Sequence, residues 1–431
     1  RGERFARHTT NLKGCNDILC LTKPEVISGI HEAYLEAGAD IIETCSLNAT
    51  TVSLKDYGLE DLAREMSRAA ASIARKAADK FSTPEKPRFV AGSIGPTAKS
   101  AFFTQDIDHP EKRQISWDEL DAAYYENARG LIEGGADFLL IETVYDSLNA
   151  KAALFAINRL SAELGRDIPA MVSATVSESG RMLTGQTSEA FCASMMHSDP
   201  LALGLNCSFG AEALKAPLQK LSAFAPCPVL FYPNAGLPDR QGVYSDTSEI
   251  MARAAEACMK DGLINIIGGC CGSTPAHIAA IAEAAKNYKP RLIPDQYKKT
   301  ILSGTQVLKI EKETIANSLN TAFPWQSALD SGNYEEAVEI ARDYNKELYI
   351  LPICPDKAPD PLAALKGFIF QASAFSELAE LPILIESSHW DVIEAGLKCL
   401  HGRGAVRYIA SEETCREKTE IIRAYGAILI S

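Results

Sequence analysis

The first 290 residues alternate short apolar segments with longer segments of helical periodicity. Seven apolar segments have the length of buried β-strands: residues 39–46, 88–96, 136–144, 169–176, 202–208, 228–236 and 264–272. Helical patterns lie between them. Residues 23–38 place apolar side chains three and four positions apart and end at a glycine, and residues 118–135 repeat this design. Strands that alternate with helices indicate an α/β protein with a parallel sheet.

A (β/α)8 barrel, or TIM barrel, is the fold that this alternation favours. Such a barrel needs eight strands, and because seven are visible, we expect the first strand to precede Arg1. An open doubly wound sheet is the alternative. In a barrel the active site forms at the carboxyl ends of the strands, and here those ends carry polar residues. They are Glu43 and Thr44, Ser93 to Pro96, Glu142 and Thr143, Asn206 and Cys207, Asn234, and Cys270 and Cys271.

Two adjacent cysteines, Cys270 and Cys271, lie between glycines in the sequence NIIGGCCGSTP. Neighbouring side chains on a strand point to opposite faces. Both thiols can therefore reach one target only where the strand ends and the backbone bends. Glycines at positions 268, 269 and 272 would permit that bend.

A third cysteine, Cys207, follows another strand of the predicted barrel. If the missing strand comes first, Cys207 ends the sixth strand and Cys270 and Cys271 end the eighth. Alternate strands contribute side chains to the same layer, so the three sulfurs can meet. Three thiolates with an open fourth position are typical of a catalytic zinc site, and thiolates favour zinc over magnesium or calcium.

The charge of such a site suggests its chemistry. Zinc with three thiolates is already net negative, so it is a weak Lewis acid, but it can keep a substrate thiol deprotonated near neutral pH. This suits alkyl transfer to sulfur. The alternative for any single cysteine is a buried, unreactive thiol. A disulfide between the adjacent cysteines would close a strained ring.

The composition of the chain argues against several other classes of protein. A net charge of −13 without a long basic cluster argues against nucleic-acid binding. No apolar run approaches the roughly 18 residues that span a membrane, so no membrane partner is expected. The twelve cysteines are scattered without the spacing of a disulfide scaffold. That usage indicates a reduced, cytoplasmic protein.

The motifs GLNC (204–207), PNAGLP (233–238) and GGCCGSTP (268–275) occur in this order. They resemble the homocysteine-binding domain of cobalamin-dependent methionine synthases. The same barrel type is found in homocysteine methyltransferases that use betaine or S-methylmethionine. The segments RGERFA, IETVYDSLNAKAA and SGRMLTGQT point to the methionine synthase family in particular. The resemblance covers residues 1 to about 305.

The resemblance implies roles for the strand-end residues. In that family the three cysteines, here Cys207, Cys270 and Cys271, bind zinc, and the homocysteine thiolate completes the tetrahedron. Asn234 would be a weak ligand that leaves when homocysteine arrives; the alternative is that it shapes the PNAGLP turn. Glu142 would bind the substrate ammonium group; the alternative is a structural carboxylate. Glu43 and Thr44 are further candidate substrate contacts.

The second half of the chain matches less well. Residues 291–305 contain prolines and lysines and are predicted to be a linker. Residues 306–431 resemble the start of the folate-binding barrel of the same family, through NYEEAVEIA (333–341) and ESSHWDVIEAGLKCLHGRG (386–404). Helices are expected at 333–344 and 389–404, and strands at 381–388 and 425–431. The second unit is therefore predicted to be a partial α/β barrel.

The pterin-binding residues of that family are not matched. Arg407 stands where the family has asparagine, and Glu386 where it has aspartate. Residues 316–322 lack the family's Gly-Glu-Arg-Thr-Asn stretch, and the acidic motif near 347–356 is replaced. We therefore expect no methyltetrahydrofolate binding by this unit. The alternative for Arg407 is a side chain that points away and pairs with Glu412 or Glu413.

The resemblance implies a homocysteine S-methyltransferase of methionine biosynthesis. A zinc-activated homocysteine thiolate would accept a methyl group from cobalamin, carried by a corrinoid-bearing module or partner protein outside this chain. Methyltetrahydrofolate would be the ultimate donor. One alternative is the same acceptor chemistry with another donor, such as S-methylmethionine or betaine. The other is a non-catalytic scaffold that docks a corrinoid protein.

Overall fold

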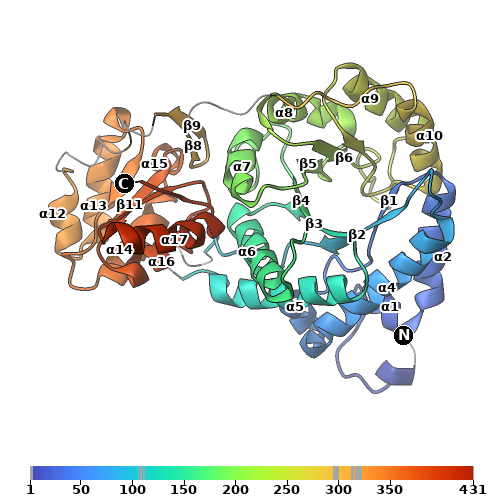
Figure 1. The fold of residues 1–431 in the computed structure, drawn as a ribbon, viewed down its shortest axis with the longest axis horizontal. Helices are drawn as coiled ribbons and strands as arrows, with labels where there is room; N and C mark the ends of the chain where they lie inside the picture. Colours follow the sequence, from blue (N-terminus) through green and yellow to red (C-terminus); the bar gives the residue numbers. More distant parts are fainter. Residues whose placement is uncertain are drawn as a thin grey trace.

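The computed structural model describes residues 3–104, 106, 109, 112–294, 300–311, 315 and 323–430. The chain forms a larger unit around a seven-strand sheet and a smaller unit around a four-strand sheet, which lie side by side in Figure 1. An antiparallel hairpin of two short strands follows the larger unit along the chain.

The seven-strand sheet confirms all seven predicted strands. They are β1 (Ile41–Glu43), β2 (Phe89–Ile94), β3 (Phe138–Val144), β4 (Ala170–Ala174), β5 (Ala202–Asn206), β6 (Val229–Tyr232) and β7 (Ile266–Ile267). The strands pair in chain order, and every neighbouring pair is parallel. A doubly wound sheet would reverse its strand order at a switch point, so that alternative is wrong. The sheet curls within a layer of helices (Figure 1), as in a TIM-barrel-like domain.

Helices connect the strands and cover the outside of the sheet. The main ones are α2 (Pro24–Glu36), α4 (Ala63–Phe81), α5 (Trp117–Glu133), α6 (Ser147–Leu164), α7 (Ser188–Met195), α8 (Ala211–Phe224), α9 (Ser248–Lys260) and α10 (Pro275–Ala285), with single turns at α1 (Leu19–Thr22) and α3 (Thr51–Leu54). Local sequence sets their starts. Ser116 and Glu119 form a capping box at the start of α5, and Pro24 is the first residue of α2.

The sheet has two edges, β1 and β7, which do not pair with each other. The helices beside these edges do meet. The Tyr34 hydroxyl of α2 donates a hydrogen bond of 2.7 Å to the Ser273 carbonyl before α10. A Cβ placed on Gly38 would lie 3.4 Å from the Cβ of Ala282. The helical layer therefore closes where the described sheet does not, and the eighth strand expected before Arg1 stays a prediction.

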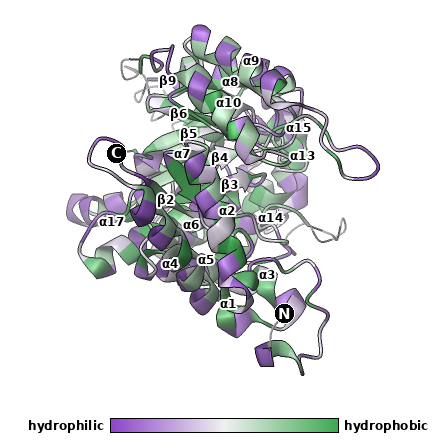
Figure 2. Ribbon diagram, turned by 90° about the vertical axis from the view of Figure 1, so that its right-hand side faces the viewer, coloured by the Kyte–Doolittle hydropathy of each residue, from purple (hydrophilic) through white to green (hydrophobic). Residues whose placement is uncertain are grey.

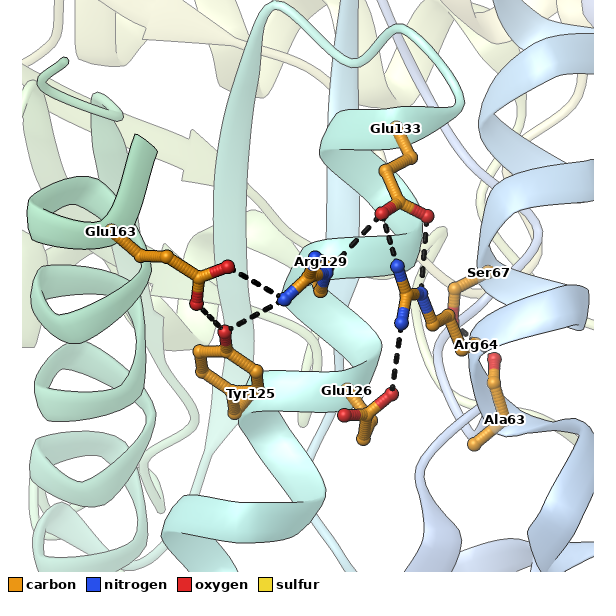
Figure 3. Close-up of polar contacts among 8 residues, drawn as sticks. All are labelled: Ala63, Arg64, Ser67, Tyr125, Glu126, Arg129, Glu133 and Glu163. Carbon is orange, nitrogen blue, oxygen red and sulfur yellow. Dashed lines mark hydrogen bonds and ion pairs between the residues drawn. The ribbon is translucent and has the colours of Figure 1, made fainter. Parts of the chain in front are cut away.

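Polar residues hold the outer helices together (Figure 3). Arg64 of α4 pairs with Glu133 and, at 4.0 Å, with Glu126 of α5. Arg129 of α5 pairs with Glu133 at 3.2 Å and with Glu163 of α6 at 2.8 Å. These side chains are at least partly exposed, so each pair contributes at most about 1 kcal/mol. Hydrophobic residues predominate in the strands of the sheet. Hydrophilic residues lie on outer helices such as α17 (Glu412–Ala424; Figure 2).

The smaller unit repeats the α/β pattern. Its strands β10 (Leu351–Ile353), β11 (Ile383–Ser387), β12 (Ala405–Tyr408) and β13 (Ile428–Leu429) form a parallel sheet in chain order. Its helices are α12 (Gln326–Asp330), α13 (Tyr334–Asp343), α14 (Pro361–Ala372), α15 (Ser376–Ala379), α16 (Trp390–Leu397) and α17. The predicted helices and strands are present, although α16 ends seven residues before Gly404. Whether this sheet belongs to a barrel stays a prediction.

The described parts of the predicted linker, residues 291–294 and 300–305, contact the larger unit and contain one strand. Arg291 is buried and donates hydrogen bonds to the carbonyls of Ser222, Ala225 and Cys227 in the larger unit. Strand β8 (Thr300–Ser303) lies within the expected linker and pairs with β9 (Val307–Ile310). Apolar residues of this stretch, such as Ile301 and Leu302, are buried against neighbouring elements, and the role of residues 291–305 as a linker stays a prediction.

One hydrophobic core runs through both units. Tyr425 of the smaller unit stacks on Phe155, with ring centroids 4.6 Å apart, and lies 5.4 Å from Trp117. The division of the chain near residue 290 into two domains stays a prediction, and the two units share this core. Among the described residues, no helix combines the length and apolar character needed to cross a membrane.

Lys151 of α6 is a polar contact inside this shared core. Its side chain is fully buried, and its Nζ donates hydrogen bonds to the carbonyls of Leu400 at 2.6 Å and Gly402 at 3.0 Å. Burial, with the nearby positive charge of Arg403, lowers the pKa of Lys151 to about 7. A Cβ on Gly426 would lie 2.6 Å from the lysine Cε. The larger unit thus satisfies backbone acceptors of the smaller one.

Candidate metal centre

Cys207 lies in a sharp bend at the end of β5. The backbone φ of Cys207 and that of Ser208 are both +62°, in the left-handed region that residues other than glycine rarely adopt. The Cys207 amide donates a hydrogen bond of 3.3 Å to the Tyr232 carbonyl at the end of β6. Neighbouring strands therefore hold a strained turn, which is common at functional sites.

Cys270 and Cys271 follow β7 after two glycines, where the backbone bends as predicted. The Cys270 amide donates to the Pro233 carbonyl at 2.8 Å, and the Cys270 carbonyl accepts from Ser273 at 3.1 Å. Of the three glycines thought to permit the bend, only Gly272 has a positive φ, +80°. Gly269 is required for packing instead, since a Cβ there would lie 2.2 Å from the Ser273 Oγ.

The bends bring the three sulfurs together. The Cys271 Sγ lies 3.9 Å from that of Cys207 and 4.0 Å from that of Cys270, and all three sulfurs lie within 4.8 Å of one another. A tetrahedral zinc with Zn–S bonds of about 2.3 Å places its sulfurs about 3.8 Å apart. The donor set and its spacing therefore fit a zinc ion.

The three thiols cannot all ionise without a cation, because adjacent thiolates repel. Hydrogen bonds from Cys207 and Cys270 lower the pKa of Cys271 to about 2. Contacts of Cys270 with Cys207 and Cys271, together with burial, raise the pKa of Cys270 well above its usual value. One thiolate thus forms readily, and a divalent cation would be needed to release the remaining protons.

Asn206, at the end of β5, and Asn234, just after β6, make contacts with the cysteine residues. The Asn206 Nδ2 lies 3.9 Å from the Cys270 Sγ. Asn234 is buried, and its Oδ1 accepts a hydrogen bond of 3.1 Å from the Cys271 amide. Asn234 therefore stabilises the bend that carries Cys271, and it also lies in the PNAGLP turn. Its role as a departing metal ligand stays a prediction.

Glu142, at the end of β3, is a buried carboxylate in the same mouth. It accepts hydrogen bonds from the Ser93 hydroxyl at 2.5 Å and the Tyr232 hydroxyl at 3.4 Å. Burial raises the pKa of Glu142 to about 7, although both hydrogen bonds oppose that rise. Within the described residues, Glu142 forms no ion pair with a basic side chain. The substrate-binding role of Glu142 stays a prediction.

The other two candidate substrate residues, Glu43 and Thr44, differ in whether their side chains are buried and already hydrogen-bonded within the protein. Thr44 is buried, and its Oγ1 accepts from the Ser93 amide at 2.9 Å and lies 2.7 Å from the Ser46 Oγ. It therefore joins β1 to β2. Part of Glu43 is exposed to solvent, while desolvation of its carboxylate and the charge of nearby Glu142 raise the pKa of Glu43. Two such carboxylates favour a cation between them.

Sequence reasoning did not single out Ser93, Tyr232 and Tyr244 as site residues. Tyr232 had a usable signal, because it lies two positions before Asn234 and so shares its face of the strand. Ser93 was seen only as a polar strand end. Tyr244 packs on Gly272, the residue after Cys271, where an added Cβ would lie 2.2 Å from the Tyr244 Cγ. It lies in the loop after β6, ten positions after Asn234, and no local pattern marks it.

The carboxyl edge of the smaller sheet carries a different cluster. Arg407 pairs with Glu386 of the neighbouring strand at 3.0 Å. The Cys354 thiol donates to the other oxygen of Glu386 at 2.7 Å. The suggested pairing of Arg407 with Glu412 or Glu413 is therefore wrong. The expected change at 316–322 lies outside the described residues.

Comparison with known proteins places these findings in context. Residues 2–285 match the family model described as homocysteine S-methyltransferase. The oxidized form of the homocysteine methyltransferase MmuM from Escherichia coli is similar, with 26% identity over 63% of this chain and 90% of that chain, at a TM-score of 0.50. Its metallated form has 27% identity over 63% of this chain and 91% of that chain, at a TM-score of 0.48.

Proposed function

The chain belongs to the homocysteine S-methyltransferase family, and we propose that its larger unit transfers a methyl group to the sulfur of homocysteine through a zinc site. The observation that carries the zinc proposal is the spacing of three cysteine sulfurs, 3.9 and 4.0 Å, at the mouth of the curled sheet. A family of methyltransferases and a preorganised thiol cluster support the same chemistry.

Cys207, Cys270 and Cys271 would hold the zinc ion. Bound zinc would supply the positive charge that keeps the homocysteine thiol deprotonated near neutral pH. The three cysteine thiolates keep the site electron-rich, so the substrate sulfur remains a good nucleophile. Its lone pair forms the new C–S bond while the bond from the methyl group to its donor breaks and the donor keeps those electrons.

Glu142 would orient the substrate by binding its ammonium group. Ser93 and Tyr232 hold the carboxylate in one place, and burial strengthens its attraction for a cation. Glu43, whose pKa is raised by desolvation and by the charge of nearby Glu142, would add to this attraction for a cation.

For the methyl donor, we propose a cobalamin carried by another module or protein, as the resemblance to methionine synthases implies. The Glu386 carboxylate is already engaged by Arg407 and Cys354. A pterin edge would have to displace both, so we propose that residues 306–431 do not bind methyltetrahydrofolate. This observation favours the alternative that another donor, such as S-methylmethionine or betaine, is used directly, whereas the overall sequence match with methionine synthases favours the cobalamin donor.

Methionine formation tests these possibilities. The zinc-loaded chain would be incubated with homocysteine and, separately, with methylcobalamin, S-methylmethionine or betaine. Turnover with methylcobalamin is expected; turnover only with S-methylmethionine or betaine would establish the alternative donor. Absence of methionine with every donor would overturn the methyltransferase proposal and favour a scaffold. Calorimetric titration of methyltetrahydrofolate should show no binding, and a micromolar dissociation constant would contradict the proposal for residues 306–431.

Replacing Glu142 by glutamine should weaken homocysteine binding by about 10- to 100-fold, because a charge-assisted hydrogen bond contributes about 1.5–3 kcal/mol. The zinc content should not change, since Glu142 does not contact a sulfur. Calorimetry would measure the affinity and elemental analysis the metal. The matched control is Glu163→Gln, at an exposed glutamate of α6. An unchanged affinity in Glu142→Gln would remove Glu142 from the substrate site.

A further inference from the structure

Strand β3 contains one extra residue at the point where it carries Glu142. Three steps along β3, from Ile141 to Val144, lie opposite two steps along β4. Thr143, within this bulge, has a φ of +58°, and a β-branched residue is a backbone outlier in that left-handed region. Bulges re-aim neighbouring side chains and are common beside active sites. The direction of Glu142 therefore depends on what holds Thr143 in this conformation.

The side chain of Asn206, at the end of β5, holds Thr143 through two hydrogen bonds. The Thr143 amide donates to the Asn206 Oδ1 at 3.0 Å, and the Asn206 Nδ2 donates to the Thr143 Oγ1 at 2.8 Å. The Ser173 hydroxyl of β4 donates to the same Oδ1 at 2.7 Å. A flipped amide would place its NH2 group against the Thr143 N–H, so these contacts fix its orientation. Asn206 is fully buried, and its one amide joins the ends of β3, β4 and β5.

Asn206 also lies against the cluster of three cysteine sulfurs. It directly precedes Cys207 in the chain, and its Nδ2 lies 3.9 Å from the Cys270 Sγ. Tyr232 makes a second connection. Its carbonyl accepts a hydrogen bond from the Cys207 amide at 3.3 Å, and its hydroxyl donates to Glu142 at 3.4 Å. Hydrogen bonds between strand ends therefore couple the position of the buried carboxylate to that of the sulfurs.

Such a coupling matters for a ligand that binds at two points. Homocysteine has a thiol at one end and an ammonium group at the other, with a short carbon chain between them. If zinc binds the sulfur and Glu142 binds the ammonium group, the affinity depends on whether these two partners stand at the separation that the chain sets. Groups that are fixed before binding need less free energy to organise, and a site tolerates errors of only about 0.5 Å.

We propose that Asn206 is a positioning residue that, through Thr143, holds Glu142 at the distance from the sulfurs that suits homocysteine. The inference rests on the proposed function, because it takes homocysteine as the substrate. It assigns to Asn206 no contact with homocysteine itself. Its consequence is selective: loss of this connection weakens the binding of a thiol that carries an ammonium group and leaves the binding of a simple thiol unchanged.

Replacing Thr143 by valine tests the proposal, because valine keeps the branched shape and the backbone amide but removes the hydroxyl that Asn206 bonds. Calorimetry on the zinc-loaded chain would measure the affinity of homocysteine and that of propane-1-thiol, which has the carbon chain of homocysteine up to its Cα but no ammonium or carboxylate group. Homocysteine should bind about three- to tenfold more weakly to Thr143→Val, as expected for the loss of one hydrogen bond. The affinity of propane-1-thiol and the zinc content should not change. Thr143→Ser retains the hydroxyl and should restore the affinity of homocysteine.

The matched control is Thr184→Val, at a buried threonine of the larger unit whose hydroxyl has no hydrogen-bond partner among the described residues. Both affinities should keep their wild-type values in this variant. Unchanged homocysteine binding in Thr143→Val would overturn the proposal. An equal loss for both thiols would also overturn it, because it would show that Asn206 only supports the zinc site. A wild-type chain that binds homocysteine but forms no methionine would overturn the proposed function and leave this inference standing, whereas one that does not bind homocysteine would overturn both.

Discussion

Replacing Cys270 by alanine is expected to remove both the zinc and the methyl transfer to homocysteine, while the seven-strand sheet stays folded. Loss of a residue that merely supports a metal ligand costs about 10- to 100-fold in metal affinity, so loss of one of three ligands should cost more. The fold should survive, because Cys270 lies in a turn beyond β7 and adds only one partly buried contact to the hydrophobic cluster of the sheet.

Elemental analysis would measure the zinc content, and circular dichroism would measure the folded sheet on the same sample. An assay of methionine formation would measure the methyl transfer. About one zinc per chain is expected in the wild type and close to none in Cys270→Ala. The matched control is Cys227→Ala, at a half-buried thiol of the larger unit that does not belong to the three-sulfur cluster. Full zinc content in Cys270→Ala would contradict the assignment of Cys207, Cys270 and Cys271 as ligands.

Replacing Lys151 by alanine is expected to destabilise the whole chain by about 3–5 kcal/mol. The substitution leaves the carbonyls of Leu400 and Gly402 buried without their donor, at about 1–3 kcal/mol each. It also opens a cavity in a packed core, which usually costs about 2–5 kcal/mol for a large side chain. Relief from burying an ammonium group offsets part of this loss, since burial already lowers the pKa of Lys151 to about 7.

Urea denaturation would measure the free energy of unfolding. Lys151→Met fills most of the space but provides no donor, so it should fall between the wild type and Lys151→Ala. The control is Lys286→Ala, at an exposed lysine of the larger unit, with an expected change below about 0.5 kcal/mol. A loss below 1 kcal/mol in Lys151→Ala would show that the contact between the units contributes little to stability.

The same contact explains how the two units are related. Lys151, the stacked rings of Phe155 and Tyr425, and the buried hairpin β8–β9 join them into one packed body. The smaller unit therefore stands in a fixed position beside the larger one.

The sequence alone determined the regular elements of the larger unit and the main features of its candidate site. Strand and helix periods depend on neighbouring residues, so all seven strands could be read from local patterns. Because parallel strands end on the same side of a sheet, the convergence of Cys207 with Cys270 and Cys271 could also be anticipated. At residues 300–303 no local pattern indicated strand β8, which forms with Ile301 and Leu302 buried.

The tertiary structure decided which distant side chains meet. Arg407 pairs with Glu386 because strand register places them opposite each other. Lys151 reaches carbonyls some 250 positions further along the chain, and Tyr244 lies on Gly272 because two loops pack together. No local period encodes such contacts. They depend on how whole elements dock, since hydrophobic burial and backbone hydrogen bonding fix the positions of these elements and each side chain then bonds to the groups it finds there.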